Sequence, residues 1–397
     1  MSLDIADALD HPVVAEVQGA GSTAASFAGL RIALVGPLPP PAGGMANQTR
    51  QLAELLRAAG AQVDLVQTNA PYRPAWAGRV PVLRAALRLL PYAARLWRAA
   101  GRADICHVMA NSGWSWHLFA APAIWIARAR GVPVVVNYRG GEAASFLSRS
   151  QALVRWSMKR CAALAVPSGF LAEVFQRFGM PSQVVPNIVD LQRFRPRVDA
   201  AVPTVAPRTS ARLLVARNLE PIYDNATALR AFALLRCSWP DATLTIAGSG
   251  PLRAELQALA AELGVQDSVH FAGRLDRDAM AAAYREADVV LNPSLVDNMP
   301  NSLLEAMASG VPVVSTDVGG VPFIVVHERT ALLVPAASPE AMAAAAGRVL
   351  DEPGLAPALR SAGLAEVERY TWPQVAPRLA AVYRAAVAPS GASVPGR

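Results

Sequence analysis

The chain has 397 residues, of which 53% are hydrophobic and 17% charged, a composition that excludes a disordered or fibrous protein. Its length favours two domains over one. The formal net charge of +7 favours anionic partners such as phosphates, nucleic acid or an anionic membrane surface.

The first part of the chain, residues 1–29, shows no apolar periodicity, and we expect a poorly ordered leader there. It carries Asp4, Asp7 and Asp10 and no basic segment, so it lacks the pattern of a secretory signal. The longest apolar stretch, Leu118–Ala127, is too short to span a bilayer. The three cysteines are far apart, which predicts free thiols in a reducing compartment. We therefore expect a cytoplasmic protein, either free or peripheral on the inner face of the cytoplasmic membrane.

From residue 30 to residue 195, short apolar runs alternate with longer helix-patterned segments such as Asn47–Ala59. Most runs are continuous and β-branched, as expected where helices cover both faces of a parallel sheet. Repetition of strand and helix predicts right-handed βαβ units and a doubly wound α/β domain. The predicted strands are Arg31–Val35, Gln62–Val66, Asp104–Met109, Val132–Tyr138, Leu164–Val166 and Gln183–Val185.

Residues 196–210 are rich in proline without apolar periodicity, which predicts a linker. The alternation resumes over residues 211–371 and predicts a second, similar domain. The helical stretch at 372–388 has no place that its own pattern defines, and residues 389–397 form a tail rich in small residues. The predicted strands of the second half are Arg212–Ala216, Thr243–Ala247, Val269–Ala272, Val289–Leu291, Val313–Thr316 and Ala331–Val334.

A polar turn and a predicted helix follow the strand Val289–Leu291, and Pro300 is well placed as the first helical residue. The next backbone N–H groups, those of Asn301, Ser302 and Leu303, would then lack helical partners. With the positive end of the helix dipole, such a terminus is suited to a diphosphate.

Two carboxylates flank this helix start. Glu305 falls about one turn into the helix, where it could accept hydrogen bonds from both hydroxyls of a ribose. Asp297 lies eight residues earlier, in the turn, and could reach the hydroxyls of a transferred sugar. Taken singly, Asp297 is equally explained as a turn or capping residue and Glu305 as a surface helix residue.

Two further loops lie at predicted helix starts. The turn AGSGP, residues 247–251, contains Gly248 and Gly250 and allows backbone to approach a phosphate or a base. The triplet Asp276–Arg277–Asp278 has the form of a metal-binding DxD sequence. It directly precedes the helix Ala279–Ala287, so we favour helix capping and expect no metal.

The ordered set of these motifs resembles the family-4 glycosyltransferases, which have the GT-B fold, over about Arg31–Val387. The resemblance implies two Rossmann-like domains that face each other across a cleft, with the helix at 372–388 crossing back to the first. The matching segments are Gly43–Gly44, Pro186–Asn187, Val189–Asp190, Arg217, Gly248–Pro251, His270–Gly273, Asp288–Ser294, Glu305–Met307 and Gly319–Gly320.

The resemblance also implies roles for single residues. Arg217 corresponds to the cationic clamp on the diphosphate, and Asp297 and Glu305 occupy the two positions of the Glu-x7-Glu motif. Gly250 would line the nucleotide, and the backbone at Arg274–Leu275 would read the base. Gly43, Gly44 and Gly248 would let backbone approach the donor or the acceptor, and Asn301, Ser302 and Leu303 would supply phosphate-binding amides.

The chain departs from the family pattern in four places. The first acid of the pair is Asp297 and not Glu, and Tyr223 stands where a lysine is usual. Arg139, in the sequence NYRGGE, replaces a histidine, and the segment PNIVD has Ile188 in place of glycine. These changes indicate a subgroup of the family, in which residues Arg139–Glu142 meet the donor sugar or the acceptor.

The predicted function is a retaining, metal-independent glycosyltransferase that uses a nucleotide-diphosphate sugar and no further cofactor. Its acceptor would be a glycan or a lipid-linked sugar, in the synthesis of surface polysaccharide or glycolipid. Two alternatives remain open: a nucleotide-sugar epimerase of the same fold and a non-catalytic nucleotide-sugar binding protein. Nucleic acid is not an expected partner, because there is no zinc-knuckle spacing and no basic and aromatic cluster.

Three features concern the acceptor side. His107 ends a strand and is a candidate for the cleft or for the core. Trp114, with Trp116 and His117, could stack on a sugar or pack in the core. A basic amphipathic helix could lie on an anionic membrane or face solvent. Its basic residues are Arg84, Arg88, Arg95, Arg98 and Arg102.

Overall fold

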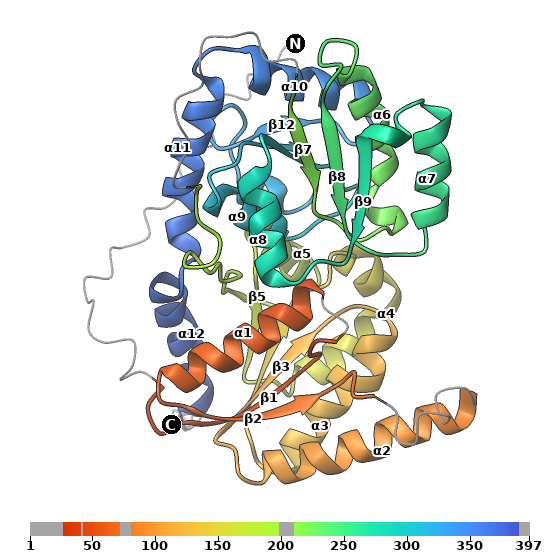
Figure 1. The fold of residues 1–397 in the computed structure, drawn as a ribbon. Coiled ribbons are helices and arrows are strands. Elements are labelled where there is room, and N and C mark those ends of the chain that lie inside the picture. Colours follow the sequence, from red (N-terminus) through yellow and green to blue (C-terminus); the bar gives the residue numbers. More distant parts are fainter. Residues whose placement is uncertain (1–26, 41–42, 72–80, 198–209, 389–397) are drawn as a thin grey trace, which may run out of the picture.

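The computed structural model describes residues 27–40, 43–71, 81–197 and 210–388. The predicted tail, most of the predicted leader and most of the predicted linker lie outside these residues. Within them, the chain forms two lobes, each built on one parallel sheet (Figure 1). No helix in the described ranges has the length and apolar character needed to cross a membrane.

The N-terminal lobe contains a six-stranded parallel sheet with the order β2-β1-β3-β4-β5-β6. The six predicted strands are confirmed, with ends that differ by at most two residues. The strands are β1 (Arg31–Gly36), β2 (Gln62–Gln67), β3 (Ile105–Ala110), β4 (Val134–Tyr138), β5 (Ala163–Val166) and β6 (Gln183–Val184). The helices are α1 (Gly44–Ala58), α2 (Pro81–Ala100), α3 (Ala121–Ala129), α4 (Ala143–Met158) and α5 (Gly169–Arg177).

The C-terminal lobe repeats this arrangement with the strand order β12-β11-β10-β7-β8-β9, and its six predicted strands are confirmed as well. The strands are β7 (Arg212–Val215), β8 (Thr243–Ala247), β9 (Val269–Gly273), β10 (Val289–Asn292), β11 (Val313–Thr316) and β12 (Leu332–Val334). The helices are α6 (Asn225–Leu235), α7 (Arg253–Glu262), α8 (Arg277–Glu286), α9 (Asn301–Ala308), α10 (Pro339–Asp351) and α11 (Leu355–Val367).

Both faces of each sheet are buried, which explains the continuous apolar runs. In β1, Ile32 and Leu34 face one core cluster, and Ala33 and Val35 face the other. The sheet of the C-terminal lobe likewise lies between two clusters. The inner strands are therefore packed on both faces, and the loops that follow them project from a rigid base.

The last helix, α12 (Trp372–Val387), leaves the C-terminal lobe and packs against the N-terminal sheet (Figure 1). Leu379 and Tyr383 join the core cluster that covers one face of that sheet. Phe27, at the end of the predicted leader, is buried and stacks on Trp372 with ring centroids 5.6 Å apart. The helix thus ties the two lobes together.

Candidate functional site

A cavity of about 770 Å³ lies between the lobes. Its walls come from segments that follow β1, β3 and β4 on one side and β7, β8, β9 and β10 on the other. In parallel sheets the carboxyl ends of the strands are the usual ligand-binding edge. Here two such edges face each other, so one ligand can contact both.

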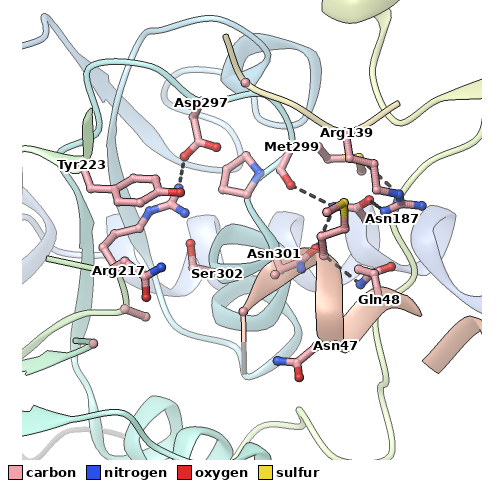
Figure 2. A pocket seen from close by; sticks show the side chains of 18 of the residues that line it. Asn47, Gln48, Arg139, Asn187, Arg217, Tyr223, Asp297, Met299, Asn301 and Ser302 are labelled. Carbon is pink, nitrogen blue, oxygen red and sulfur yellow. Dashed lines mark hydrogen bonds and ion pairs between the residues drawn. The ribbon is translucent and has the colours of Figure 1, made fainter. Parts of the chain in front are cut away.

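Arg217 and Asp297 form the centre of the C-terminal wall. The guanidinium pairs with the Asp297 carboxylate, its Nε donates to Oδ1 of Asn292 over 2.6 Å, and its Cζ lies 5.1 Å from the centroid of the Tyr223 ring (Figure 2). Desolvation lowers the pKa of Arg217. From the sequence we expected these two side chains to contact different parts of the donor. In the structure they form an ion pair with each other.

Asn292 positions this arginine and was missed by the sequence analysis. Its Nδ2 donates to Ser315 Oγ over 2.8 Å, and its Oδ1 also accepts from Ser294 Oγ over 3.1 Å. All three residues are almost fully buried. A single asparagine at the end of the apolar strand β10 was the available signal, since a buried amide needs partners.

Glycines hold the loops of this wall close to one another. A Cβ on Gly248 would lie 1.9 Å from the carbonyl oxygen of Arg217, and one on Gly250 would lie 2.2 Å from that of Leu219. Gly248 lines the cavity, but Gly250 does not. Gly250 was expected to line the nucleotide. In the structure a glycine is required there because the loop after β8 packs closely against the backbone of Leu219.

The predicted phosphate site at the start of α9 faces the cavity, with two corrections. Pro300 is the residue before the helix, not the first helical one. Leu303 does not offer a free amide, because its N–H donates to the Pro300 carbonyl over 3.2 Å and its side chain is in the core. Asn301 and Ser302 do line the cavity. The Ser302 hydroxyl is buried and has no hydrogen-bond partner among the described residues.

Glu305 lies one turn into α9 and lines the same cavity. Desolvation raises the pKa of its carboxyl to about 7, although a hydrogen bond from Tyr284 (3.2 Å) and the charges of Arg277 and Arg217 oppose the rise. Arg277 was expected only as the middle of a capping triplet. In the structure it lines the cavity and pairs with Asp190 over 3.5 Å.

The capping interpretation of Asp276 is confirmed. Its Oδ1 accepts hydrogen bonds from the backbone N–H groups of Asp278 (3.0 Å) and Ala279 (2.8 Å). The nearby residues expected to read a base, Arg274 and Leu275, line the cavity. Arg274 donates to Ser249 Oγ over 3.1 Å, which connects the loops after β8 and β9.

The N-terminal wall is built around Arg139, which directly follows β4. Its Nε donates to Asn137 Oδ1 over 3.2 Å, and its Nη1 donates to Asn187 Oδ1 (Figure 2). Asn187 in turn donates to the Met299 carbonyl (2.9 Å) and to Asn301 Oδ1 (2.7 Å). This chain of amides crosses from the first lobe to the start of α9 in the second.

Gln48, on α1, was also missed. Its side chain donates to the Ile188 carbonyl over 3.0 Å and accepts from the Ile188 N–H over 3.2 Å. It therefore holds the PNIVD segment through the backbone, which explains how isoleucine is tolerated there. Gly43 and Gly44, directly before and at the start of α1, line the cavity, and so does Glu142, whose side chain is exposed.

His107 and Trp114, expected on the acceptor side, do not line the cavity. His107 is fully buried, where Nδ1 shares a hydrogen bond with Tyr383 Oη (2.7 Å) and Nε2 with Asn137 Nδ2 (3.2 Å). Burial lowers the pKa of His107 to about 3, so the ring is neutral. Trp114 is 77% exposed outside the cavity, whereas Trp116 is in the core.

The basic helix corresponds to α2, on the outer edge of the N-terminal lobe (Figure 1), and its described side chains do not line the cavity. It continues through Pro91. Arg102 lies beyond its end and pairs with Asp64 over 3.4 Å, so it does not belong to the basic face of the helix.

Comparisons with known proteins agree with this geometry. The family described as Glycosyltransferase Family 4 matches residues 42–193, and the one described as Glycosyl transferases group 1 matches residues 210–352. The chain is 31% identical to glycogen synthase of Mycobacterium tuberculosis over 320 residues, covering 77% of this chain and 73% of that protein.

A second relative is D-inositol 3-phosphate glycosyltransferase of Streptomyces scabiei, 32% identical over 247 residues. That match covers 59% of this chain and 55% of the relative, so the chain spans little more than half the length of that protein. Among known structures, sucrose-phosphate synthase from Thermosynechococcus elongatus has a TM-score of 0.72 at 23% identity, covering 89% of this chain and 98% of that one. Anabaena Alr3699/HepE in complex with UDP and glucose has a TM-score of 0.67 at 17% identity, covering 89% and 99%. These likenesses confirm the predicted GT-B fold.

Proposed function

The chain belongs to the family-4 glycosyltransferases of GT-B fold, and on this premise we propose that it is a retaining enzyme. It transfers a sugar from a nucleotide-diphosphate donor to a glycan or lipid-linked acceptor. The observation that carries the proposal is the start of α9. There the Ser302 hydroxyl, which has no hydrogen-bond partner in the part of the chain that the structure describes, and the first turn of the helix lie at the same cavity as Arg217.

The C-terminal wall offers a contact for each part of the donor. The amides of Asn301 and Ser302 and the Ser302 hydroxyl suit a diphosphate at the positive end of α9. Glu305, one turn on, suits the ribose hydroxyls. The pair of Arg217 and Asp297 lies between the lobes, where the arginine can meet phosphate while the carboxylate accepts from a sugar hydroxyl.

The proposed chemistry is dissociation of the sugar–phosphate bond with charge stabilisation by the protein. As the nucleoside diphosphate leaves, negative charge grows on its terminal phosphate and the sugar becomes oxocarbenium-like. Arg217 and the α9 amides stabilise the first of these charges in a partly desolvated site. The acceptor hydroxyl then attacks the anomeric carbon from the face that the diphosphate leaves and gives its proton to the departing phosphate oxygen, so the anomeric configuration is retained. We propose that these fixed donors make a metal ion or other cofactor unnecessary.

The proposal includes contact with an anionic membrane, as an enzyme of surface polysaccharide or glycolipid synthesis would need. On α2, Leu90 and Trp97 are 69% and 47% exposed, and Arg95 and Arg98 are exposed on the same helix. Exposure of both apolar and basic side chains is typical of interfacial helices. Co-sedimentation with phosphatidylglycerol vesicles but not with phosphatidylcholine vesicles is expected. If equal amounts of protein co-sediment with both kinds of vesicle, α2 is a solvent-exposed face and not a membrane-binding one.

The test of the central proposal is Arg217→Gln, compared with Arg212→Gln, which removes an exposed arginine from the same strand segment outside the cavity. A thermal-shift screen of nucleotide sugars first identifies a donor. We expect Arg217→Gln to lower kcat by a factor of about 100 to 1,000, as loss of one fixed donor to a developing charge does elsewhere. The control should retain full activity. If Arg217→Gln transfers sugar at a rate within a few-fold of wild type, Arg217 does not stabilise the leaving diphosphate. If the sugar nucleotide is converted to an isomer without added acceptor, the protein is an epimerase.

A further inference from the structure

The cations of the cavity differ in their partners. Arg217 is paired with Asp297 and Arg277 with Asp190. Arg274 is exposed and bonds to Ser249, whereas Arg50 is repelled by the like charge of Arg277 and has no carboxylate within ion-pair distance among the described residues. Arg139 is only partly accessible, and its two side-chain partners are the neutral amide oxygens of Asn137 and Asn187. Within the described ranges, no carboxylate lies within ion-pair distance of it.

The position of Arg139 relates it to the donor sugar. Asn187 bonds both Arg139 and Asn301, so the guanidinium is separated from the predicted phosphate site by a single side chain. Figure 2 shows Arg139 and Arg217 on opposite sides of Asn301 and Ser302. A sugar bonded to a diphosphate at this helix start would extend from it between these two arginines.

No acidic side chain of the described residues pairs with the charge of Arg139. Desolvation lowers the pKa of Arg139 to about 10, which still leaves the guanidinium protonated at neutral pH. A guanidinium has five N–H donors in a planar fork that matches a carboxylate. Asn137 and Asn187 accept two of these hydrogen bonds, and the remaining donors are available on a side chain that lines the cavity.

Resting on the proposed function, we propose that Arg139 binds a carboxylate on the transferred sugar, so that the donor is a nucleotide-activated acidic sugar of the uronic acid class. On the opposite wall, Arg217 neutralises the carboxylate of Asp297. The cavity carboxylate nearest to Arg139 in sequence, Glu142, has an exposed side chain, and water screens its charge. The diphosphate has its own partners in Arg217 and the α9 amides.

The experiment is calorimetric titration of the full chain with matched donors: UDP-glucose against UDP-glucuronate, GDP-mannose against GDP-mannuronate, and UDP and GDP alone. One of the two pairs carries the nucleotide base that the protein binds. In that pair, the wild type should bind the acidic sugar nucleotide at least about tenfold more tightly than the neutral one, as expected for a charged hydrogen bond. Arg139→Gln should bring this ratio close to one and leave the affinity for the free nucleoside diphosphate within a few-fold. Arg139→Lys should keep part of the preference.

Arg149→Gln, an exposed residue of α4, removes the same charge far from the cavity and should keep the full preference. A wild type that binds the neutral sugar as tightly as the acidic one overturns the inference. So does Arg139→Gln if it weakens free UDP or GDP as much as the acidic donor, since Arg139 would then be a phosphate ligand. Failure of both free nucleoside diphosphates to bind contradicts the proposed function itself, and the inference with it.

Discussion

The two walls of the cleft are built on different principles. On the C-terminal wall, Arg217 is paired with Asp297, and Arg277 is paired with Asp190 of the PNIVD segment. The N-terminal wall has amides and two arginines, Arg50 and Arg139, without an acidic partner among the described residues. A wall whose arginines are already paired with carboxylates keeps its geometry without a ligand. Stabilisation of a leaving diphosphate requires such preorganised donors. A wall with an unmet charge selects its ligand by that charge.

The walls also differ in how their backbones are held. On the C-terminal side, loops touch through glycines: a Cβ on Gly319 would lie 2.1 Å from the Asp297 carbonyl oxygen, and one on Gly320 would lie 1.7 Å from that of Asn298. On the N-terminal side, side-chain amides such as Gln48 and Asn187 hold the loops. Where two backbones touch at a glycine, there is no room for a Cβ atom. The hydrogen bonds of side-chain amides can instead be removed one at a time without a steric clash. Substitutions should therefore cost more on the C-terminal wall.

The largest effect is expected for Gly248→Ala. The new Cβ would lie 1.9 Å from the Arg217 carbonyl oxygen, so the backbone that carries the clamp must move. We expect a loss of roughly 2–4 kcal/mol in the free energy of unfolding, a cost typical of overpacked or strained buried sites. Urea unfolding measures the loss, and transfer activity should fall even at temperatures where the variant is folded.

Gly347→Ala is the matched control, because a Cβ there would meet no atom closer than 3.8 Å, within helix α10. It should stabilise the protein by about 0.5–1 kcal/mol through helix propensity. If both variants unfold at the same urea concentration, the C-terminal wall is not held by glycine contact and the contrast between the walls is lost.

The same contrast explains what the sequence could predict. Asp297, Asn301, Ser302 and Glu305 lie within thirteen residues after the end of β10, so a local motif was enough to predict that they share one site. Most strands were also predictable, because those inside each sheet place successive side chains on two buried faces and have continuous apolar sequences. Local patterns therefore gave the fold and most of the C-terminal wall.

The N-terminal wall could not be predicted in this way. Arg139 meets Asn187, which lies 48 positions away, and Asn187 meets Asn301, a further 114 positions away. His107 was a candidate for the cleft because it was expected to end a strand, but it is the third of the six residues of β3 and is fully buried. Its partner Tyr383 comes from 276 positions away on α12, and no local pattern indicates that this helix would cover it. Contacts between distant segments depend on tertiary packing, which periodicity does not encode.

An intermediate effect is expected for Glu305→Gln, and it depends on pH. Burial raises the folded-state pKa of Glu305 to about 7, above the value of 4.5 for a free side chain. Between these two values the folded state binds more protons than the unfolded state, so this carboxyl lowers stability as pH rises. Without ligand, the variant should gain roughly 2 kcal/mol relative to wild type between pH 5 and pH 8.

Urea unfolding at several pH values measures this difference. Glu262→Gln removes an exposed carboxyl on α7 and should follow the wild-type pH dependence. Parallel curves for wild type and Glu305→Gln would mean that the carboxyl is solvated in the ligand-free cavity. Donor affinity in wild type should rise as pH passes 7, because only the ionised carboxylate can accept from both ribose hydroxyls.

The smallest effect is expected for Tyr383→Phe, which tests how the N-terminal wall is supported. Its hydroxyl bonds His107, which bonds Asn137, which accepts from Arg139, so the α12 helix is connected to the cavity by side chains alone. Loss of the hydroxyl leaves a buried ring nitrogen without this partner, at a cost of about 1 kcal/mol. We expect KM for the donor to rise with little change in kcat.

Tyr92→Phe separates support of the wall from general stability. The Tyr92 hydroxyl donates to the Phe119 carbonyl over 2.8 Å and is buried in the same lobe, but it has no connection to the cavity. Both variants should lose similar stability, while only Tyr383→Phe should change KM. If Tyr92→Phe raises KM equally, the N-terminal wall depends on the overall stability of its lobe and not on the chain of hydrogen bonds from α12. The loose construction of that wall would then be a property of its packing, and the difference between the two walls would lie in their charges alone.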